Sequence, residues 1–107
     1  MNPKEAQGVL LSRLGVLIDV REEEELRESG IAEGALWMPI SKIAEDHPDW
    51  RELRKTLSKD KIVMLYCRSG ARSGQLAAFL AAEGYRTANV GGFKDWQAAN
   101  LPWKKFP

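Results

Sequence analysis

The sequence predicts an α/β domain built around a parallel sheet. Short apolar runs alternate with helix-like stretches along the chain, which is the pattern of α/β proteins. The apolar run within Lys61–Tyr66 is typical of a central strand that is covered on both faces. With 107 residues the chain has room for one hydrophobic core, so we expect a single domain over residues 1–107.

The N-terminal half is expected to supply helices and two short strands in turn. A capping residue and a proline precede a helix over 4–14, and a buried strand follows at Val16–Ile18. The acidic helix 22–27 has its glutamates at the end of the helix dipole that favours negative charge. A second short strand over 35–38 then leads into a two-part helix over 41–57.

The C-terminal half gives the clearest pattern of strand and helix. The expected elements are a strand over 61–66, a helix over 72–83, a strand over 87–90 and a helix over 93–99. In the helix over 72–83, we expect Leu76, Phe79 and Leu80 to share the buried face. The tail after residue 100 is expected to pack back on the domain.

Charge and composition exclude several classes of function. Sixteen basic residues against fifteen acidic ones give a net charge of +1, which argues against a nucleic-acid partner. The longest apolar run, Leu76–Ala82, is too short to cross a bilayer, so we expect no membrane partner. The polar start of the chain carries no signal-peptide core, and the expected location is cytoplasmic.

The chain has one cysteine and one histidine, which narrows the possible chemistry. A single cysteine cannot form an internal disulfide, and no group of Cys and His has the spacing of metal ligands. We interpret His47 as a surface residue at a helix start, because Pro48 follows it. Chemistry is therefore expected from Cys67, carboxylates, arginines and backbone amides, with no metal site.

Cys67 lies at the carboxyl end of the predicted central strand, and a short loop with Gly70 follows it. A helix then begins near Arg72. Ligands of open α/β sheets bind at this end of the strands, and loop amides beside a helix start can cradle an anion. The same partial charges stabilise a thiolate, and they lower the pKa of such a cysteine from about 8.5 to about 3.5–7.5. Cys67 is therefore the candidate nucleophile.

The loop and several other segments resemble the rhodanese-like domain family. The motifs that carry the resemblance are, in chain order, Ile18-Asp19-Val20-Arg21, Gly34-Ala35, Met38-Pro39-Ile40, Cys67-Arg68-Ser69-Gly70-Ala71-Arg72, Val90-Gly91-Gly92-Phe93, Trp96 and Leu101-Pro102. The resemblance implies a three-layer domain, with helices on both faces of a mostly parallel sheet. It also implies that residues 68–72, namely Arg68, Ser69, Gly70, Ala71 and Arg72, bind the substrate around Cys67.

The resemblance implies transfer of sulfane sulfur from thiosulfate, or a related small anionic donor, to a thiol or cyanide. The sulfur would travel as a persulfide on Cys67. No cofactor is expected, because the cysteine is itself the covalent carrier. A protein is a further possible sulfur acceptor.

Four residues outside the loop's core are assigned supporting roles. Asp19 and Arg21 flank the end of the first strand, and we interpret them as a structural pair. The resemblance implies that Glu25, six positions after Asp19, approaches the loop and faces Arg72, while the alternative is a solvated carboxylate on its helix. Ser73 lies at the start of the helix that follows the loop.

Two other functions are compatible with this fold. One is phosphatase or arsenate-reductase chemistry, but such loops are one residue longer and have arginine six positions after the cysteine. Here that position is Ser73, and Arg72 stands at five. The other is a persulfide carrier or docking module that works with a protein partner, and the sequence does not separate this role from that of a thiosulfate enzyme.

Overall fold

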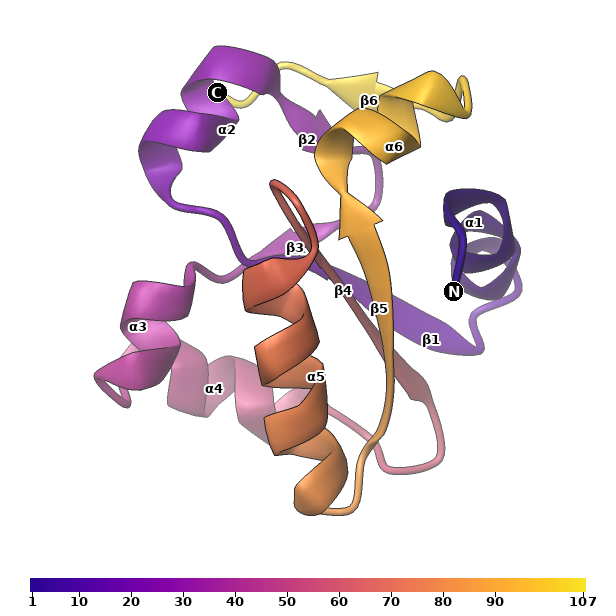
Figure 1. Ribbon diagram of the computed structural model, residues 1–107. Helices are drawn as coiled ribbons and strands as arrows, with labels where there is room; N and C mark the ends of the chain where they lie inside the picture. Colours follow the sequence, from indigo (N-terminus) through magenta and orange to yellow (C-terminus); the bar gives the residue numbers. More distant parts are fainter.

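The computed structural model describes residues 1–107, which form helices and strands in alternation (Figure 1). The elements in chain order are α1 (Pro3–Leu11), β1 (Gly15–Asp19), α2 (Glu23–Ser29), β2 (Ile31–Ala32), β3 (Leu36–Trp37), α3 (Ile40–Ala44), α4 (Pro48–Thr56), β4 (Ile62–Cys67), α5 (Ala71–Ala82), β5 (Arg86–Gly92), α6 (Phe93–Ala98) and β6 (Trp103–Lys104). This order confirms the predicted α/β class.

The main sheet has four parallel strands in the order β3-β1-β4-β5. β4 lies between β1 and β5 and is buried from Val63 onward, as its apolar sequence predicted. A separate antiparallel pair joins β2 to β6. Because all four strands of the main sheet run the same way, their carboxyl ends meet at one edge, and Cys67 lies there.

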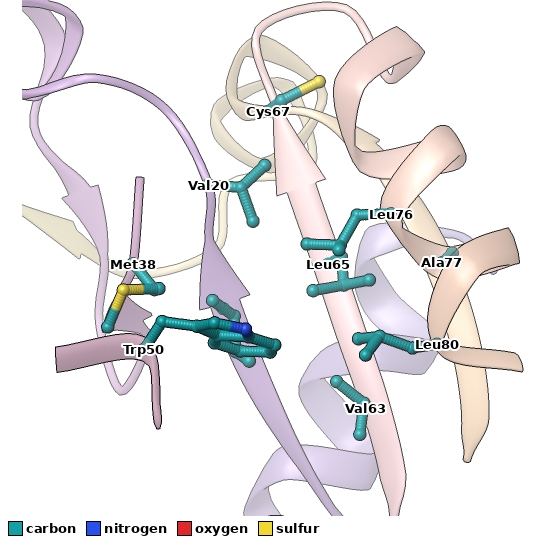
Figure 2. Packing of buried hydrophobic residues seen from close by; sticks show 10 residues of the cluster. Val20, Met38, Trp50, Val63, Leu65, Cys67, Leu76, Ala77 and Leu80 are labelled. Carbon is teal, nitrogen blue, oxygen red and sulfur yellow. The ribbon is translucent and has the colours of Figure 1, made fainter. Parts of the chain in front are cut away.

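Helices cover both faces of the sheet, and each face has its own core. On one face, Trp50 from α4 and Leu80 from α5 pack against sheet residues that include Leu65 (Figure 2). On the other face, Ala6 from α1 and Trp96 from α6 pack against sheet residues that include Met64. The three-layer arrangement implied by the family resemblance is thus confirmed.

Several element boundaries differ from the sequence expectation, each for a local reason. α1 ends at Leu11 because the chain turns at Arg13, whose φ is 59°. β1 begins at Gly15, one residue before the expected strand, and a Cβ there would lie 2.5 Å from the carbonyl oxygen of Ile62. Phe79 is 51% exposed, so its placement on the buried face of α5 was wrong.

The expected return of the tail is confirmed, although its form was not anticipated. The tail pairs β6 with β2. His47 precedes α4, where its Nδ1 accepts a hydrogen bond from the Asp49 amide at 3.0 Å. None of the helices is both long enough and apolar enough to cross a bilayer.

Candidate active site

The sulfur of Cys67 lies where β4 passes into the loop before α5 (Figure 2). The residue is completely buried. Its Sγ accepts a hydrogen bond from the Gly70 amide at 3.1 Å, and the Ser73 hydroxyl oxygen lies 3.3 Å away. The predicted strand, cysteine, glycine loop and helix start therefore do meet at one atom.

Glycines allow the loop to take this shape. Gly70 has a φ of 96°, in the left-handed region that favours glycine, and it directly precedes α5. Gly92, at the end of β5, has no room for a side chain because a Cβ there would overlap the carbonyl group of Arg68. The glycine at 92 thus lets β5 approach the loop closely.

The pKa of the Cys67 thiol is shifted below its ordinary value. Burial acts against this shift, because it disfavours the charged thiolate. The Ser73 hydroxyl and the amides of Ser73, Gly70 and Ser69 outweigh it, since all of them direct positive charge at the sulfur. The site therefore favours a thiolate, which is the form of cysteine that acts as a nucleophile.

Arg72 does not turn its guanidinium toward the sulfur as a free cation. Its Nη1 and Nη2 donate to the two carboxylate oxygens of Glu25 at 2.8 and 2.6 Å. Glu25 also accepts from the Glu22 amide at 2.9 Å. Hydrogen bonds from Arg72 hold the pKa of Glu25 below its ordinary range. Of the two interpretations left open for Glu25, the structure shows the one in which it faces Arg72.

Asp19 and Arg21 form a buried ion pair at the carboxyl end of β1, the strand next to β4. Arg21 Nη2 donates to Asp19 at 2.7 Å and to the carbonyl oxygen of Gly30 at 2.6 Å, while Nη1 donates to Ser29 at 2.6 Å. The guanidinium lies 4.5 Å from the centre of the Phe93 ring. With its donors engaged in this way, Arg21 ties β1 to the end of α2.

The remaining loop residues face solvent. Arg68, Ser69 and Ala71 are exposed, and Arg68 lines a pocket of about 280 Å³. The residues that line this pocket are Arg21, Glu25, Glu28, Ser29, Arg68, Phe93, Lys94 and Gln97. Arg68 and Lys94 form no salt bridge, and neither does Glu28 in the same pocket, so the unpaired charges there are two positive and one negative.

Sequence reasoning missed Asn89 and the α6 side of the pocket. Asn89 Nδ2 donates to the carbonyl oxygen of Gly70 at 2.9 Å, and its Oδ1 lies 2.7 Å from the Ser73 hydroxyl. The available signal was a polar amide inside a strand, where asparagine is rare. Nothing in the sequence placed Lys94 in one pocket with Arg68, because only the pairing of β5 with β4 brings α6 to this edge of the sheet.

Comparison with known proteins gives a consistent picture. Residues 2–99 match the family described as the rhodanese-like domain. A Bacillus subtilis protein provisionally named sulfurtransferase YtwF is 39% identical over 87 residues, which are 80% of this chain and 77% of that protein. Thiosulfate sulfurtransferase GlpE of Actinobacillus succinogenes is 33% identical over 104 residues, or 95% of this chain and 86% of that protein.

The fold agrees with a solved structure as well. A structure described as rhodanese with anions from E. coli superposes with a TM-score of 0.67 at 30% sequence identity. The match covers 86% of this chain and 99% of that one.

Proposed function

The chain belongs to the rhodanese-like domain family, and we propose that it transfers sulfur from thiosulfate to a thiol or cyanide through a persulfide on Cys67. Relatives that are named sulfurtransferases support sulfur transfer in general. The observation that carries the finer proposal is the buried sulfur that faces an amide at 3.1 Å and a hydroxyl at 3.3 Å. In this proposal residues 1–107 act as one domain.

In the first step, the Cys67 thiolate attacks the outer sulfur of thiosulfate. A bond forms between Sγ and that sulfur, while the sulfur–sulfur bond of thiosulfate breaks and its electron pair leaves with sulfite. After transfer the terminal sulfur of the persulfide carries the negative charge, and we expect the loop amides that stabilise the thiolate to stabilise this charge as well. In this proposal the cysteine supplies the only covalent chemistry.

In the second step, a thiolate or cyanide attacks the terminal sulfur of the persulfide. The new bond joins this sulfur to the acceptor, and the bond to Sγ breaks with its electron pair, which restores the Cys67 thiolate. The products are a persulfide of the acceptor thiol, or thiocyanate when cyanide is the acceptor. Neither step requires an external oxidant or reductant.

The pocket beside the loop suits the approach of an anion. Arg68 and Lys94 form no salt bridge and outnumber the unpaired Glu28 in the pocket, and thiosulfate carries two negative charges. Because no part of Cys67 reaches the surface, the proposal also requires the loop around the sulfur to open as the substrate enters. The site should thus select small or extended donors over bulky ones.

The arginine geometry argues against a phosphatase. In that chemistry, a guanidinium beside the cysteine would bind the oxyanion, but Arg72 is engaged by both oxygens of Glu25. A protein acceptor remains compatible with the same first step, since it would differ only in the thiol that removes the sulfur.

The proposal is tested by steady-state turnover of thiosulfate with cyanide as acceptor. We expect the parent protein to form thiocyanate and the Cys67→Ala variant, with its fold intact by circular dichroism, to form none above the uncatalysed rate. Turnover of an aryl phosphate is measured beside it and should be absent. Equal thiocyanate formation by both proteins would disprove the role of Cys67.

A further inference from the structure

Asn89 on β5 connects three parts of the Cys67 cradle. Its Nδ2 donates to the carbonyl oxygen of Gly70 at 2.9 Å, and its Oδ1 accepts from the Gly91 amide at 3.1 Å. These two bonds define which amide atom is oxygen and which is nitrogen, because a flipped side chain would lose both. The same Oδ1 lies 2.7 Å from the hydroxyl oxygen of Ser73.

The Ser73 hydroxyl has one proton and two acceptors within reach, since Cys67 Sγ lies 3.3 Å away on the other side. When the sulfur is protonated, the hydroxyl can donate to Asn89. When the sulfur is a thiolate, the hydroxyl can turn and donate to it, while Asn89 Oδ1 keeps its bond to Gly91. No buried polar group of this network is left unpaired in either state.

The space that Asn89 occupies is kept open by a helix glycine. A Cβ on Gly74 would lie 3.0 Å from Asn89 Nδ2. Glycine inside a helix is less favourable than alanine by about 0.5–1 kcal/mol, and α5 has one here, on its second turn. The contact with Asn89 explains why a small residue lies at this point of the helix.

We propose that Asn89 is a positioning residue that acts on Cys67 through Ser73, by offering the hydroxyl proton an alternative acceptor. This inference rests on the proposed role of Cys67 as the nucleophile. The amide oxygen stabilises the thiol state, because it accepts the hydroxyl proton whenever the sulfur does not. Asn89 therefore limits how strongly Ser73 favours the thiolate.

The charged groups around the site include the N-terminal ammonium group, which donates to the backbone carbonyl oxygen of Asn89 at 3.3 Å, and Lys94 on α6, which lines the pocket with Arg68. Arg68 belongs to the loop, Arg72 on α5 is paired with Glu25 on α2, and Asp95 on α6 accepts from the Gly92 amide at 3.0 Å. On β1, the Asp19–Arg21 pair is engaged with itself and the end of α2. None of these groups is altered by substitution at 89 or 73.

The test is the pKa shift that Ser73→Ala causes in Cys67, measured in three backgrounds. The ultraviolet absorbance of the thiolate reports ionisation of the single cysteine. The same titration of the matched Cys67→Ser protein gives the absorbance change of the tyrosines, which is subtracted. The backgrounds are the parent protein, Asn89→Leu, which offers no acceptor, and Asn89→Asp, which offers a stronger one. Effects of residue 89 that do not pass through Ser73 cancel in this comparison.

We expect Ser73→Ala to raise the pKa most in the Asn89→Leu background, less in the parent and least in Asn89→Asp. The difference between the Leu background and the parent should be about tenfold in the thiolate-to-thiol ratio, the size of one hydrogen bond to a charged group. Thr87→Val is the matched control. It removes a different bond between β5 and α5, from Thr87 to the carbonyl oxygen of Ala77 at 2.9 Å, so the effect of Ser73→Ala should equal that in the parent.

Equal effects of Ser73→Ala in all backgrounds would overturn the inference. If one Asn89 variant fails to fold, the other still decides the order relative to the parent. The titration does not depend on sulfur transfer. The ordered shifts in a protein that never accepts sulfur would therefore contradict the proposed function and leave the role of Asn89 standing.

Discussion

Replacing Glu25 by Gln tests the link between α2 and the Cys67 loop. The change keeps the shape of the side chain but removes its negative charge. The Glu25 carboxylate accepts two short hydrogen bonds from Arg72, at 2.8 and 2.6 Å. Hydrogen bonds to charged groups contribute about 1.5–3 kcal/mol each when buried, and exposed ion pairs about 0–1 kcal/mol. The two side chains are 32% and 21% exposed, so we expect a loss of about 1–2 kcal/mol.

Thermal unfolding measures this loss of stability. In a domain of this size, a loss of about 1 kcal/mol in the free energy of unfolding lowers Tm by about 4–8 °C. Glu23→Gln is the matched control on the same helix, because the pair of Glu23 with Arg27 is 53% and 60% exposed and should contribute little. The pKa of Glu25 is depressed, so its contribution is complete above the ordinary value of 4.5 and is lost as the pH falls through the depressed pKa.

The same substitution leaves the charge of Arg72 uncompensated. Because that charge acts on the sulfur, the pKa of Cys67 should fall further even as the protein loses stability. A Glu25→Gln protein that is no less stable than Glu23→Gln, and whose Cys67 titrates as in the parent, would refute the account of this pair.

Three further predictions concern the loop. Arg68→Ala should mainly raise KM for thiosulfate, whereas Arg72→Ala should also lower kcat, by up to about tenfold, because it removes a positive charge that acts on the sulfur at a distance; identical defects in steady-state kinetics would contradict this division. Gly92→Ala should displace the carbonyl group of Arg68 and greatly reduce turnover, whereas Gly8→Ala, with nothing within 4 Å of the new Cβ, should leave turnover unchanged. The stability of the parent relative to Cys67→Ser should rise with pH from the depressed pKa up to the ordinary value of 9.0; a flat difference in denaturant titrations would contradict the shift.

The sequence was sufficient to predict the parts of the fold that depend on local patterns. Both ends of β4 and both ends of α5 were predicted to within one residue, because an apolar run, a glycine and a helix start follow one another directly. Burial on α5 was harder to predict. Phe79 is as apolar as Leu80, but it is 51% exposed whereas Leu80 is fully buried, and only the packed structure shows this difference.

In the candidate site, too, the residues that could be predicted are those that depend on local sequence. Cys67 and its loop were found because the chemistry depends on neighbours in sequence. Glu25 could be suspected but not decided, since its contact with Arg72 joins residues 47 positions apart. Asn89 and β2–β6 were missed, because they depend on pairings across the chain that leave almost no local pattern.

Intact-protein mass spectrometry tests most directly whether Cys67 carries the sulfur. After incubation with thiosulfate and removal of excess reagent, the parent protein should gain the mass of one sulfur atom, and cyanide or a small thiol should remove it. The Cys67→Ala protein should gain nothing. Addition of sulfur to both proteins, or to neither, would contradict the account.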